Sequence, residues 1–277
     1  MDYQALHFQI NPELNEILIA ELSELGYESF LENEHGFSAY LPFHLFDEES
    51  IINLQQTYQE NIHFTYTHEF IKAENWNAKW EADYAPVIIE NQCLIKSSFH
   101  QIDTEYPYQI LINPKMSFGT GHHDTTALMI THLLDTDLSG KTVLDAGCGT
   151  GILAIMAHKR GAVGVKGFDI EEWAVENAQE NITLNNCPDI QIWLGTIETV
   201  APHEKFDCLI ANIQRNVLLA EMHLYAQHLN SKGILFVSGF YEADIEDLVQ
   251  EAGKYSLQLD SKKISPQSWT ALKFLLN

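Results

Sequence analysis

The feature that most constrains this chain is a short apolar run that leads directly into three closely spaced glycines. The segment reads Thr142-Val-Leu-Asp-Ala-Gly-Cys-Gly-Thr-Gly-Ile152. It predicts a strand, a tight loop and a helix over about 152–160. Glycines let a ligand approach the bare backbone, and the start of a helix offers free N–H groups. The segment therefore predicts a ligand-binding turn, and the alternative is a turn whose small residues serve packing alone.

The glycine spacing and a nearby acid narrow the choice of ligand. Gly147, Gly149 and Gly151 form G-x-G-x-G, one residue shorter than the dinucleotide fingerprint, which argues against an NAD-dependent dehydrogenase. The next predicted strand ends in Asp169. An acid at the tip of the second strand can accept hydrogen bonds from both ribose hydroxyls of a nucleoside. The alternative for Asp169 is a cap on the helix that begins near Glu171.

The order of strand and helix patterns divides the chain into two domains. Residues 1–71 read β-α-β-β-α-β, which predicts a small N-terminal α+β domain of ferredoxin-like order and, we expect, a substrate-recognition role. Residues 72–92 are predicted to form an aromatic linker, a short helix with Trp76, Trp80 and Tyr84 on one face. The predicted elements of the first domain are strands at 5–10, 29–31, 37–41 and 63–70 and helices at 12–25 and 47–58.

Residues 93–277 alternate between strand and helix patterns. This order predicts an α/β domain with a mostly parallel sheet and helices on both faces, because right-handed crossovers connect such strands. The last two strands have no long helix between them and should pair antiparallel. The predicted strands lie near 142–147, 163–169, 191–195, 206–212, 233–239, 256–263 and 270–277, and the helices near 125–135, 152–160, 171–186, 215–230 and 243–252.

Charge and cysteine content limit the possible partners. The 277 residues hold 39 acids against 15 Lys and Arg, a formal net charge of −24. Such a chain should repel nucleic acid and anionic membranes and attract cationic partners, although acidity can also serve solubility alone. The four cysteines form no C-x-x-C pair, and neither a signal peptide nor a membrane-length apolar run is visible. We expect a soluble, monomeric protein of the cytoplasm.

Two further motifs flank the glycine loop. Upstream lies Asn113-Pro-Lys-Met-Ser-Phe-Gly-Thr-Gly-His-His-Asp-Thr-Thr126, in which Asp124 or Thr125 is expected to cap the next helix. Downstream, the strand Phe206-Asp-Cys-Leu-Ile-Ala-Asn-Ile213 ends in Asn212. Ligands of open α/β sheets bind beyond the carboxyl ends of the strands, so Asp145, Asp169 and Asn212 should converge there. The alternative for Asn212 is a cap on helix 215–230.

Together these motifs resemble the bacterial methyltransferases of ribosomal protein L11, the PrmA family. The resemblance rests on Phe118-Gly-Thr-Gly-His-His-Asp-Thr-Thr126, Asp145-Ala-Gly-Cys-Gly-Thr-Gly-Ile-Leu-Ala-Ile155, Ala211-Asn-Ile213 and the linker Trp76…Trp80…Pro86. It implies a class I, Rossmann-like methyltransferase with a seven-stranded sheet and S-adenosylmethionine (AdoMet) as cofactor. It also implies that Thr126, the loop of Gly147, Gly149 and Gly151, and Asp169 bind AdoMet. Within that set, Gly147 would lie against the methionine portion, Asp169 would hold the ribose, and Asn212 would stand beside the methyl group and the target nitrogen.

The implied activity is methyl transfer from AdoMet to amino groups of L11, namely lysine side chains and the N-terminal amine. Two departures concern the family pattern: Asp124 replaces the usual proline, and the first domain is too divergent for recognition residues to be transferred. Two rival functions stay open, an N-methyltransferase of another protein or small amine, and a non-catalytic AdoMet-binding module on the ribosome. We assign no general base. His122 and His123 lack a spaced third ligand, so we expect no metal.

Overall fold

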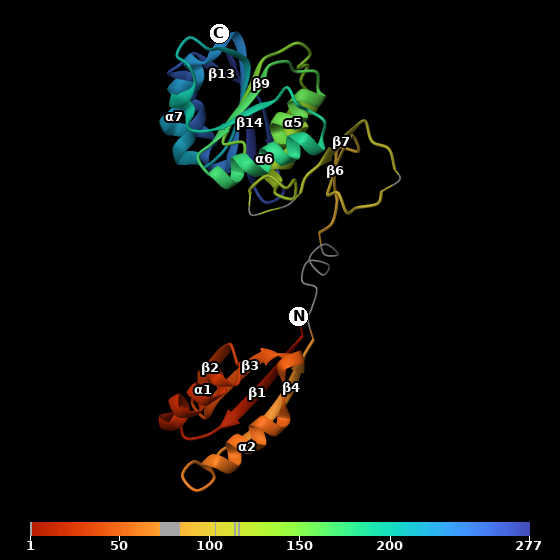
Figure 1. Cartoon of the computed structure of the whole chain (residues 1–277). Helices are drawn as coiled ribbons and strands as arrows, with labels where there is room; N and C mark the ends of the chain where they lie inside the picture. The colour runs from red at the N-terminus through yellow and green to blue at the C-terminus, as the bar shows by residue number, and fades with distance from the viewer. Residues whose placement is uncertain (1, 73–83, 103, 114, 116) are drawn as a thin grey trace. The chain divides into compact units, whose positions relative to one another are not determined.

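The computed structural model describes residues 2–72, 84–102, 104–113, 115 and 117–277. The chain divides into two compact units, Met1–Asp83 and Tyr84–Asn277 (Figure 1). Trp76 and Trp80, and with them most of the predicted linker helix, lie outside the described residues. The predicted linker extended too far toward the C-terminus, because its last part already forms strand β5 (Val87–Ile89) of the second unit.

The first unit is a four-stranded antiparallel sheet in the order β2-β3-β1-β4. Its element order confirms the predicted β-α-β-β-α-β arrangement. Alternate residues of a strand face opposite sides of a sheet, and Leu6, Phe8, Phe37 and Leu41 accordingly share one core with Leu18. The elements are β1 (Tyr3–Gln9), α1 (Asn15–Glu24), β2 (Ser29–Asn33), β3 (Gly36–Pro42), α2 (Glu48–Tyr58) and β4 (Thr65–Ile71).

The second unit is built on a seven-stranded sheet in the order β10-β9-β8-β11-β12-β14-β13. Strands β10, β9, β8, β11 and β12 run parallel, and β14 pairs antiparallel with both β12 and β13, which confirms the predicted antiparallel edge. The strands are β8 (Val143–Ala146), β9 (Val165–Asp169), β10 (Gln191–Leu194), β11 (Phe206–Asn212), β12 (Leu229–Tyr241), β13 (Leu257–Ile264) and β14 (Trp269–Leu276). The predicted class I methyltransferase fold is thus confirmed.

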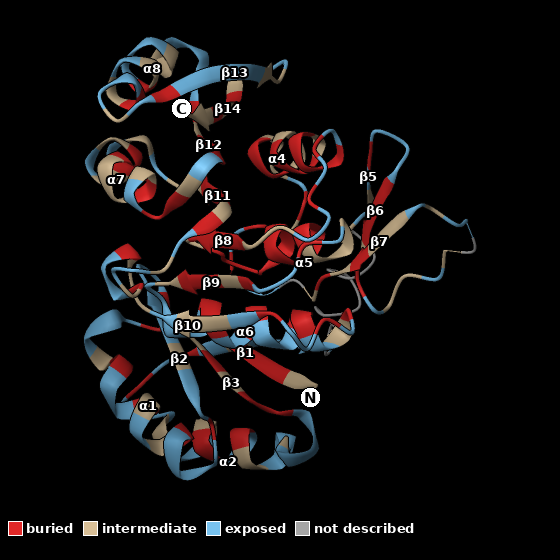
Figure 2. Ribbon diagram, turned by 90° about the horizontal axis from the view of Figure 1, so that it is seen from above, coloured by how far each residue is buried: buried red, intermediate tan, exposed pale blue. Residues whose placement is uncertain are grey.

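Two hydrophobic cores cover the two faces of this sheet. One contains side chains of α4 (Asp124–Leu134), α5 (Ile152–Lys159) and α6 (Glu172–Leu184). The other contains side chains of α7 (Arg215–Gln227) and α8 (Ile245–Gly253). Figure 2 shows the buried strands β8, β9 and β11 between these helices. Helices on both faces leave the carboxyl ends of the central strands as the open place for a ligand.

A second sheet in this unit escaped the sequence analysis. It contains β5, β6 (Cys93–Lys96) and β7 (Tyr108–Leu111), with β5 and β6 antiparallel and β6 and β7 parallel. Ile95 and Ile110 bury their side chains in the same core as α4 and α5. These strands are only three or four residues long, too short for clear alternation to appear in the sequence.

At the start of α4, the prediction that Asp124 or Thr125 caps the helix is wrong. The cap is His123, whose side chain accepts the N–H of Thr125 at 3.3 Å, whereas Asp124 is already the first helical residue. Asp124 still contributes as an acid in the first turn, where negative charge is favourable. Across the described residues, no helix is both long enough and apolar enough to cross a bilayer.

Candidate active site

A cavity of about 580 Å³ lies at the carboxyl ends of β8, β9 and β11. It brings together Gly147, Gly149, Asp169 and Asn212, four of the six residues predicted to form the site. The lining residues are Phe118, His123, Thr125, Gly147, Gly149, Phe168, Asp169, Ile170, Glu171, Trp173, Ala174, Thr196, Asn212, Ile213, Gln214, Val217, Glu221, Gly239 and Trp269.

The glycine loop follows β8 and turns the bare backbone toward this cavity. Gly147 and Gly149 have φ angles of +69° and +53°, a backbone region that residues other than glycine seldom adopt. A Cβ at Gly149 would stand 2.3 Å from the carbonyl oxygen of Phe118, and one at Gly147 would stand 2.5 Å from a methyl carbon of Ile213. Glycine is therefore required by both backbone conformation and close packing.

Asp169 ends β9 and braces the loop from the side. Its Oδ2 accepts the N–H of Gly149 at 2.9 Å, and its Oδ1 accepts the N–H of Glu171 at 3.1 Å. The second bond belongs to the turn that leads into α6, whose N-cap is Glu171 and which has no side-chain cap bond, so the capping alternative for Asp169 is not observed. Each carboxylate oxygen keeps a further lone pair, and Asp169 lines the cavity. The same side chain can therefore brace the loop and accept hydrogen bonds from a ligand.

Asp145 lies beneath the loop and is almost fully buried, with 1% of its surface exposed. Its Oδ2 accepts the N–H of Ala154 in the first turn of α5 at 3.0 Å. Burial raises the pKa of this carboxyl to about 7, and the negative charge of Asp169 adds to the increase. Because Asp145 already satisfies an N–H at the start of α5, it occupies part of the anion site that a dinucleotide pyrophosphate would use.

Asn212 is the last residue of β11 and lines the cavity. Its side-chain oxygen Oδ1 is buried and has no hydrogen-bond partner within the described chain. The alternative cap is not observed, because α7 is preceded by Gln214 and its start carries no side-chain cap bond. A buried acceptor without a partner is costly. Because Asn212 also lines the cavity, a ligand bound there can supply the missing donor.

The other two predicted residues do not line the cavity. Gly151 precedes α5, and a Cβ there would stand 3.2 Å from the Cβ of Ala178 on α6, so this glycine permits close helix packing. Thr126 is fully buried in α4. Its neighbour Thr125 lines the cavity instead.

Several aromatic lining residues were not identified from the sequence. The ring centroids of Phe118 and His123 are 5.2 Å apart, and those of His123 and Trp269 are 4.7 Å apart. Tyr241 stacks on Trp269 at 4.1 Å. Trp173, four residues after Asp169 in the chain, also lines the cavity and is 47% exposed. A tryptophan four residues after the acid of the second strand was the one usable sequence signal.

The charged lining residues favour a cationic ligand. Asp169, Glu171 and Glu221 line the cavity, and no Lys or Arg does so among the residues the structure describes. Opposite charges attract strongly where water is partly excluded. Over the same described ranges, no cluster of three or more His, Cys, Asp or Glu could hold a metal ion.

Sequence comparisons identify known proteins that are similar to this chain. The model of a family described as Ribosomal protein L11 methyltransferase (PrmA) matches residues 6–276. The Ribosomal protein L11 methyltransferase of Bacteroides fragilis is 41% identical over the whole of both chains. That of Porphyromonas gingivalis is 42% identical, covering 94% of this chain and 90% of the relative.

A solved structure agrees with these sequence matches. The crystal structure of a ribosomal protein L11 methylase from Lactobacillus delbrueckii subsp. bulgaricus is 29% identical and superposes with a TM-score of 0.62. The superposition covers 69% of this chain and 97% of that chain.

Proposed function

Because this chain belongs to the ribosomal protein L11 methyltransferase family, we propose that it transfers methyl groups from AdoMet to amino groups of ribosomal protein L11. The acceptors are lysine side chains and the N-terminal amine. The observation that carries the proposal is the buried, unpaired Oδ1 of Asn212, which shares one cavity with Asp169 and the glycine loop.

The residues of the cavity fit AdoMet. An added Cβ at Gly147 or Gly149 would collide with Ile213 or with the carbonyl oxygen of Phe118, two residues that also line the cavity. Glycine therefore keeps the loop close to these cavity residues, where the methionine portion of the cofactor would lie. Asp169 retains lone pairs for the two ribose hydroxyls. The acidic side chains of the lining suit a sulfonium cation and, before it, an incoming lysine.

When bound, AdoMet supplies an activated methyl group, so the protein has mainly to align the reacting atoms and exclude water. A lysine amine has a pKa of about 10.4 in water and must be neutral to attack. A partly desolvated cavity favours the neutral form. With AdoMet bound, Asn212 Oδ1 would accept one N–H of the amine and thereby turn the nitrogen lone pair toward the methyl group. The transfer would form an N–C bond and break the C–S bond, and the proton of the new ammonium would leave to water.

The charge of the protein supports a basic protein substrate. A net charge of −24 attracts a basic ribosomal protein and accelerates its encounter. The same charge opposes direct contact with ribosomal RNA. We therefore propose that the enzyme acts on the protein substrate alone, as a monomer in the cytoplasm, where L11 is made.

A methyl-transfer assay tests the function. The full chain, incubated with methyl-labelled AdoMet and purified L11, should label the protein, and mass spectrometry should show gains of 14 Da per methyl group at amine positions, about the mass of one CH₂ added per transfer. Free lysine in place of L11 distinguishes a small-amine enzyme. AdoMet binding without turnover on L11 would favour the non-catalytic module. Absence of both binding and transfer would overturn the proposal.

A further inference from the structure

Two asparagines on one face of α6, and a third that caps its C-terminus, are buried and point toward a non-helical segment of the chain. Asn177, Asn181 and the cap Asn185 follow one another at intervals of four residues, so they lie on the same side. Their exposed fractions are 0%, 0% and 8%. Buried amides of this kind need hydrogen-bond partners. Each of the three bonds to residues 111–113, although the Oδ1 of Asn177 has no partner among the described residues.

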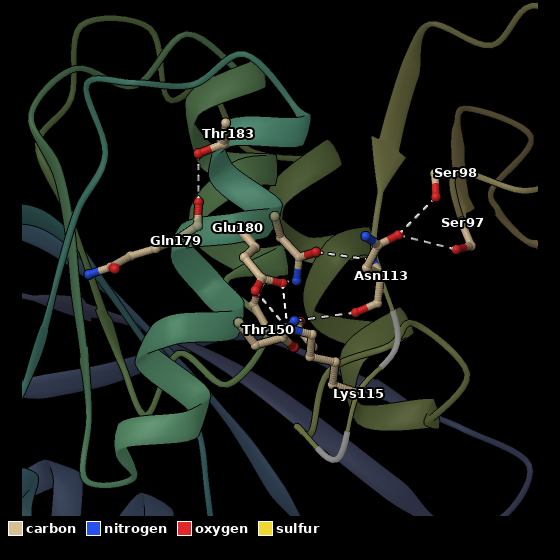
Figure 3. Close-up of polar contacts among 10 residues, drawn as sticks. Ser97, Ser98, Asn113, Lys115, Thr150, Gln179, Glu180 and Thr183 are labelled. Carbon is tan, nitrogen blue, oxygen red and sulfur yellow. Dashed lines mark hydrogen bonds and ion pairs between the residues drawn. The ribbon is translucent and has the colours of Figure 1, made fainter.

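The asparagines bind the main chain of this segment much as a neighbouring strand would. Asn185 accepts the N–H of Leu111 at 2.9 Å and donates to its carbonyl at 2.7 Å. Asn181 accepts the N–H of Asn113 at 3.0 Å, and Asn177 donates to the carbonyl of Asn113 at 3.3 Å. Figure 3 shows Asn113 facing α6 in this way. We call these three residues the asparagine ladder.

Asn181 differs from the other two members because it also contacts the glycine loop. Its Nδ2 donates to the carbonyl oxygen of Thr150 at 3.0 Å. Thr150 in turn donates through its N–H to the carbonyl of Phe118 at 2.9 Å and through Oγ1 to the carbonyl of Gly119 at 2.6 Å. The backbone N–H, the backbone carbonyl and the hydroxyl of Thr150 are thus all used to join three parts of the chain.

These contacts set the position of cavity walls that Asn181 does not itself touch. Phe118 and Gly149 line the cavity, whereas Asn181 and Thr150 do not. The tight approach of Phe118 to Gly149 leaves no room for a Cβ. A shift of Thr150 would therefore move both the backbone of Gly149 and the adjacent Phe118, two parts of the cavity wall.

We propose that Asn181 is a positioning residue for the cofactor: one amide holds Thr150 of the glycine loop and Asn113 at the start of the Phe118 loop in a single geometry. The inference rests on the proposed AdoMet site. Its chemical basis is that one buried side chain acts as donor to one loop and acceptor from the other. Neither an ionised Asp nor Leu at this position can do both, so the comparison with Asp is made above pH 8.

Asn181→Asp is the most discriminating change. Aspartate keeps the size of asparagine and the acceptor for the N–H of Asn113, but it places an oxygen against the carbonyl oxygen of Thr150. Two acceptors in contact repel, and the buried carbonyl loses its donor. Asn185→Asp is the matched control, because it makes the same chemical change four residues further on, at the C-cap of α6, where the partners are Leu111 and the carbonyl of Asn181.

The full-length variants are compared by calorimetric titration with AdoMet and by thermal unfolding. Both substitutions should lower Tm. Asn181→Asp should raise the Kd for AdoMet at least tenfold, whereas Asn185→Asp should leave it within threefold. If Asn181→Asp does not fold, Thr150→Val replaces it, since valine keeps the shape and removes only the bond to Gly119; it should weaken AdoMet binding in the same way.

The outcomes separate this inference from the proposed function. A wild-type protein that does not bind AdoMet would overturn the function and the inference together. A wild-type protein that binds AdoMet, with Asn181→Asp and Thr150→Val binding equally well, would overturn the inference alone. Equal weakening by Asn181→Asp and Asn185→Asp would also overturn it, because the ladder would then act only through the stability of the fold.

Discussion

The carboxylate of Asp145 and the backbone N–H of Ala154 form a 3.0 Å hydrogen bond directly beneath the glycine loop. The bond joins the end of β8 to the first turn of α5, and it lies in the interior, where Asp145 is 1% exposed. A carboxyl group in such a place is held by its hydrogen bond but disfavoured when charged. The charge of Asp145, and with it the stability of the structure beneath the glycine loop, therefore depends on pH.

We expect Asp145→Asn to be more stabilising, relative to wild type, at high pH than at low pH. Burial raises the pKa of Asp145 from 3.8 to about 7 in the folded state, so the folded protein binds this proton more tightly than the unfolded chain. The stability contributed by this proton is fully present below about pH 4 and is lost as pH rises to about 7. The asparagine variant keeps an acceptor for Ala154 but cannot ionise. Chemical denaturation at pH 5 and pH 8 measures the difference, and an identical difference at the two values would contradict the prediction.

The contribution of His132 to stability changes with pH in the opposite direction to that of Asp145. Burial lowers the pKa of this histidine from 6.5 to about 4, and its Nε2 lies 3.2 Å from the carbonyl oxygen of Ala271. The folded protein therefore keeps the ring neutral while the unfolded chain protonates. Stability is lost as pH falls from about 6.5 to about 4. His132→Gln should remove this loss, so the free energy of unfolding of the variant relative to that of wild type should be higher at pH 5 than at pH 7. A difference between the two proteins that is the same at both pH values would disprove the assignment.

Asn212→Ala should separate catalysis from stability. The variant loses the acceptor that orients the amine, and kcat should fall by about two orders of magnitude, the scale seen when a reactant loses its alignment. The unpaired buried oxygen disappears with the side chain, so Tm should not fall as it does when a bonded buried group is removed. Steady-state kinetics on L11 and a thermal scan test both halves. A large drop in Tm with unchanged kcat would show that Asn212 is structural.

Asp169→Asn should weaken AdoMet binding. The neutral amide loses the charge on which hydrogen bonds from hydroxyls depend, and bonds to charged groups contribute about 1.5–3 kcal/mol, a factor of roughly 10 to 100 in Kd. Turnover at saturating AdoMet should change much less, because Asp169 is placed at the sugar and away from the reacting atoms. Titration calorimetry gives Kd and single-turnover kinetics give the rate of the methyl-transfer step. A normal Kd would remove Asp169 from the cofactor site.

Gly149→Ala should destabilise the protein more than Gly140→Ala. Both glycines have positive φ, +53° and +71°, so alanine is strained at either position by about 1–2 kcal/mol. A Cβ at Gly140 meets no atom within 4 Å, whereas one at Gly149 would stand 2.3 Å from the carbonyl oxygen of Phe118. Urea denaturation should show the larger loss for Gly149→Ala, together with weaker AdoMet binding for that variant alone. Equal losses of stability in the two variants would mean that the Phe118 loop can move away from the added Cβ at little energetic cost.

Local patterns explain why much of the fold could be predicted. The glycine loop, the acid at Asp169 and the β/α order are each recognised from a short stretch of sequence. All seven strands of the main sheet were expected near their observed positions. The antiparallel edge also followed, because a short connection between β13 and β14 permits only that pairing. These features depend on residues that are close together in the sequence.

Contacts between distant residues explain what could not be predicted. The short strands β5, β6 and β7 are stabilised by burial against α4 and α5, not by their own alternation. The choice of Thr125 over Thr126 as a lining residue follows from the rotation of α4, which the cap at His123 helps to set. Trp269 joins the cavity from the far end of the chain.

The sequence by itself determined the class of fold, the chemical nature of the ligand loop and the residues at the ends of β9 and β11, because backbone conformation and charge are properties of short segments. Only the tertiary structure decided that Gly151 serves helix packing, that Asn212 Oδ1 is left without a partner, and that Asn181 joins two loops. The physical reason is that burial and hydrogen-bond satisfaction depend on which segments meet, and those segments are tens of residues apart in the chain.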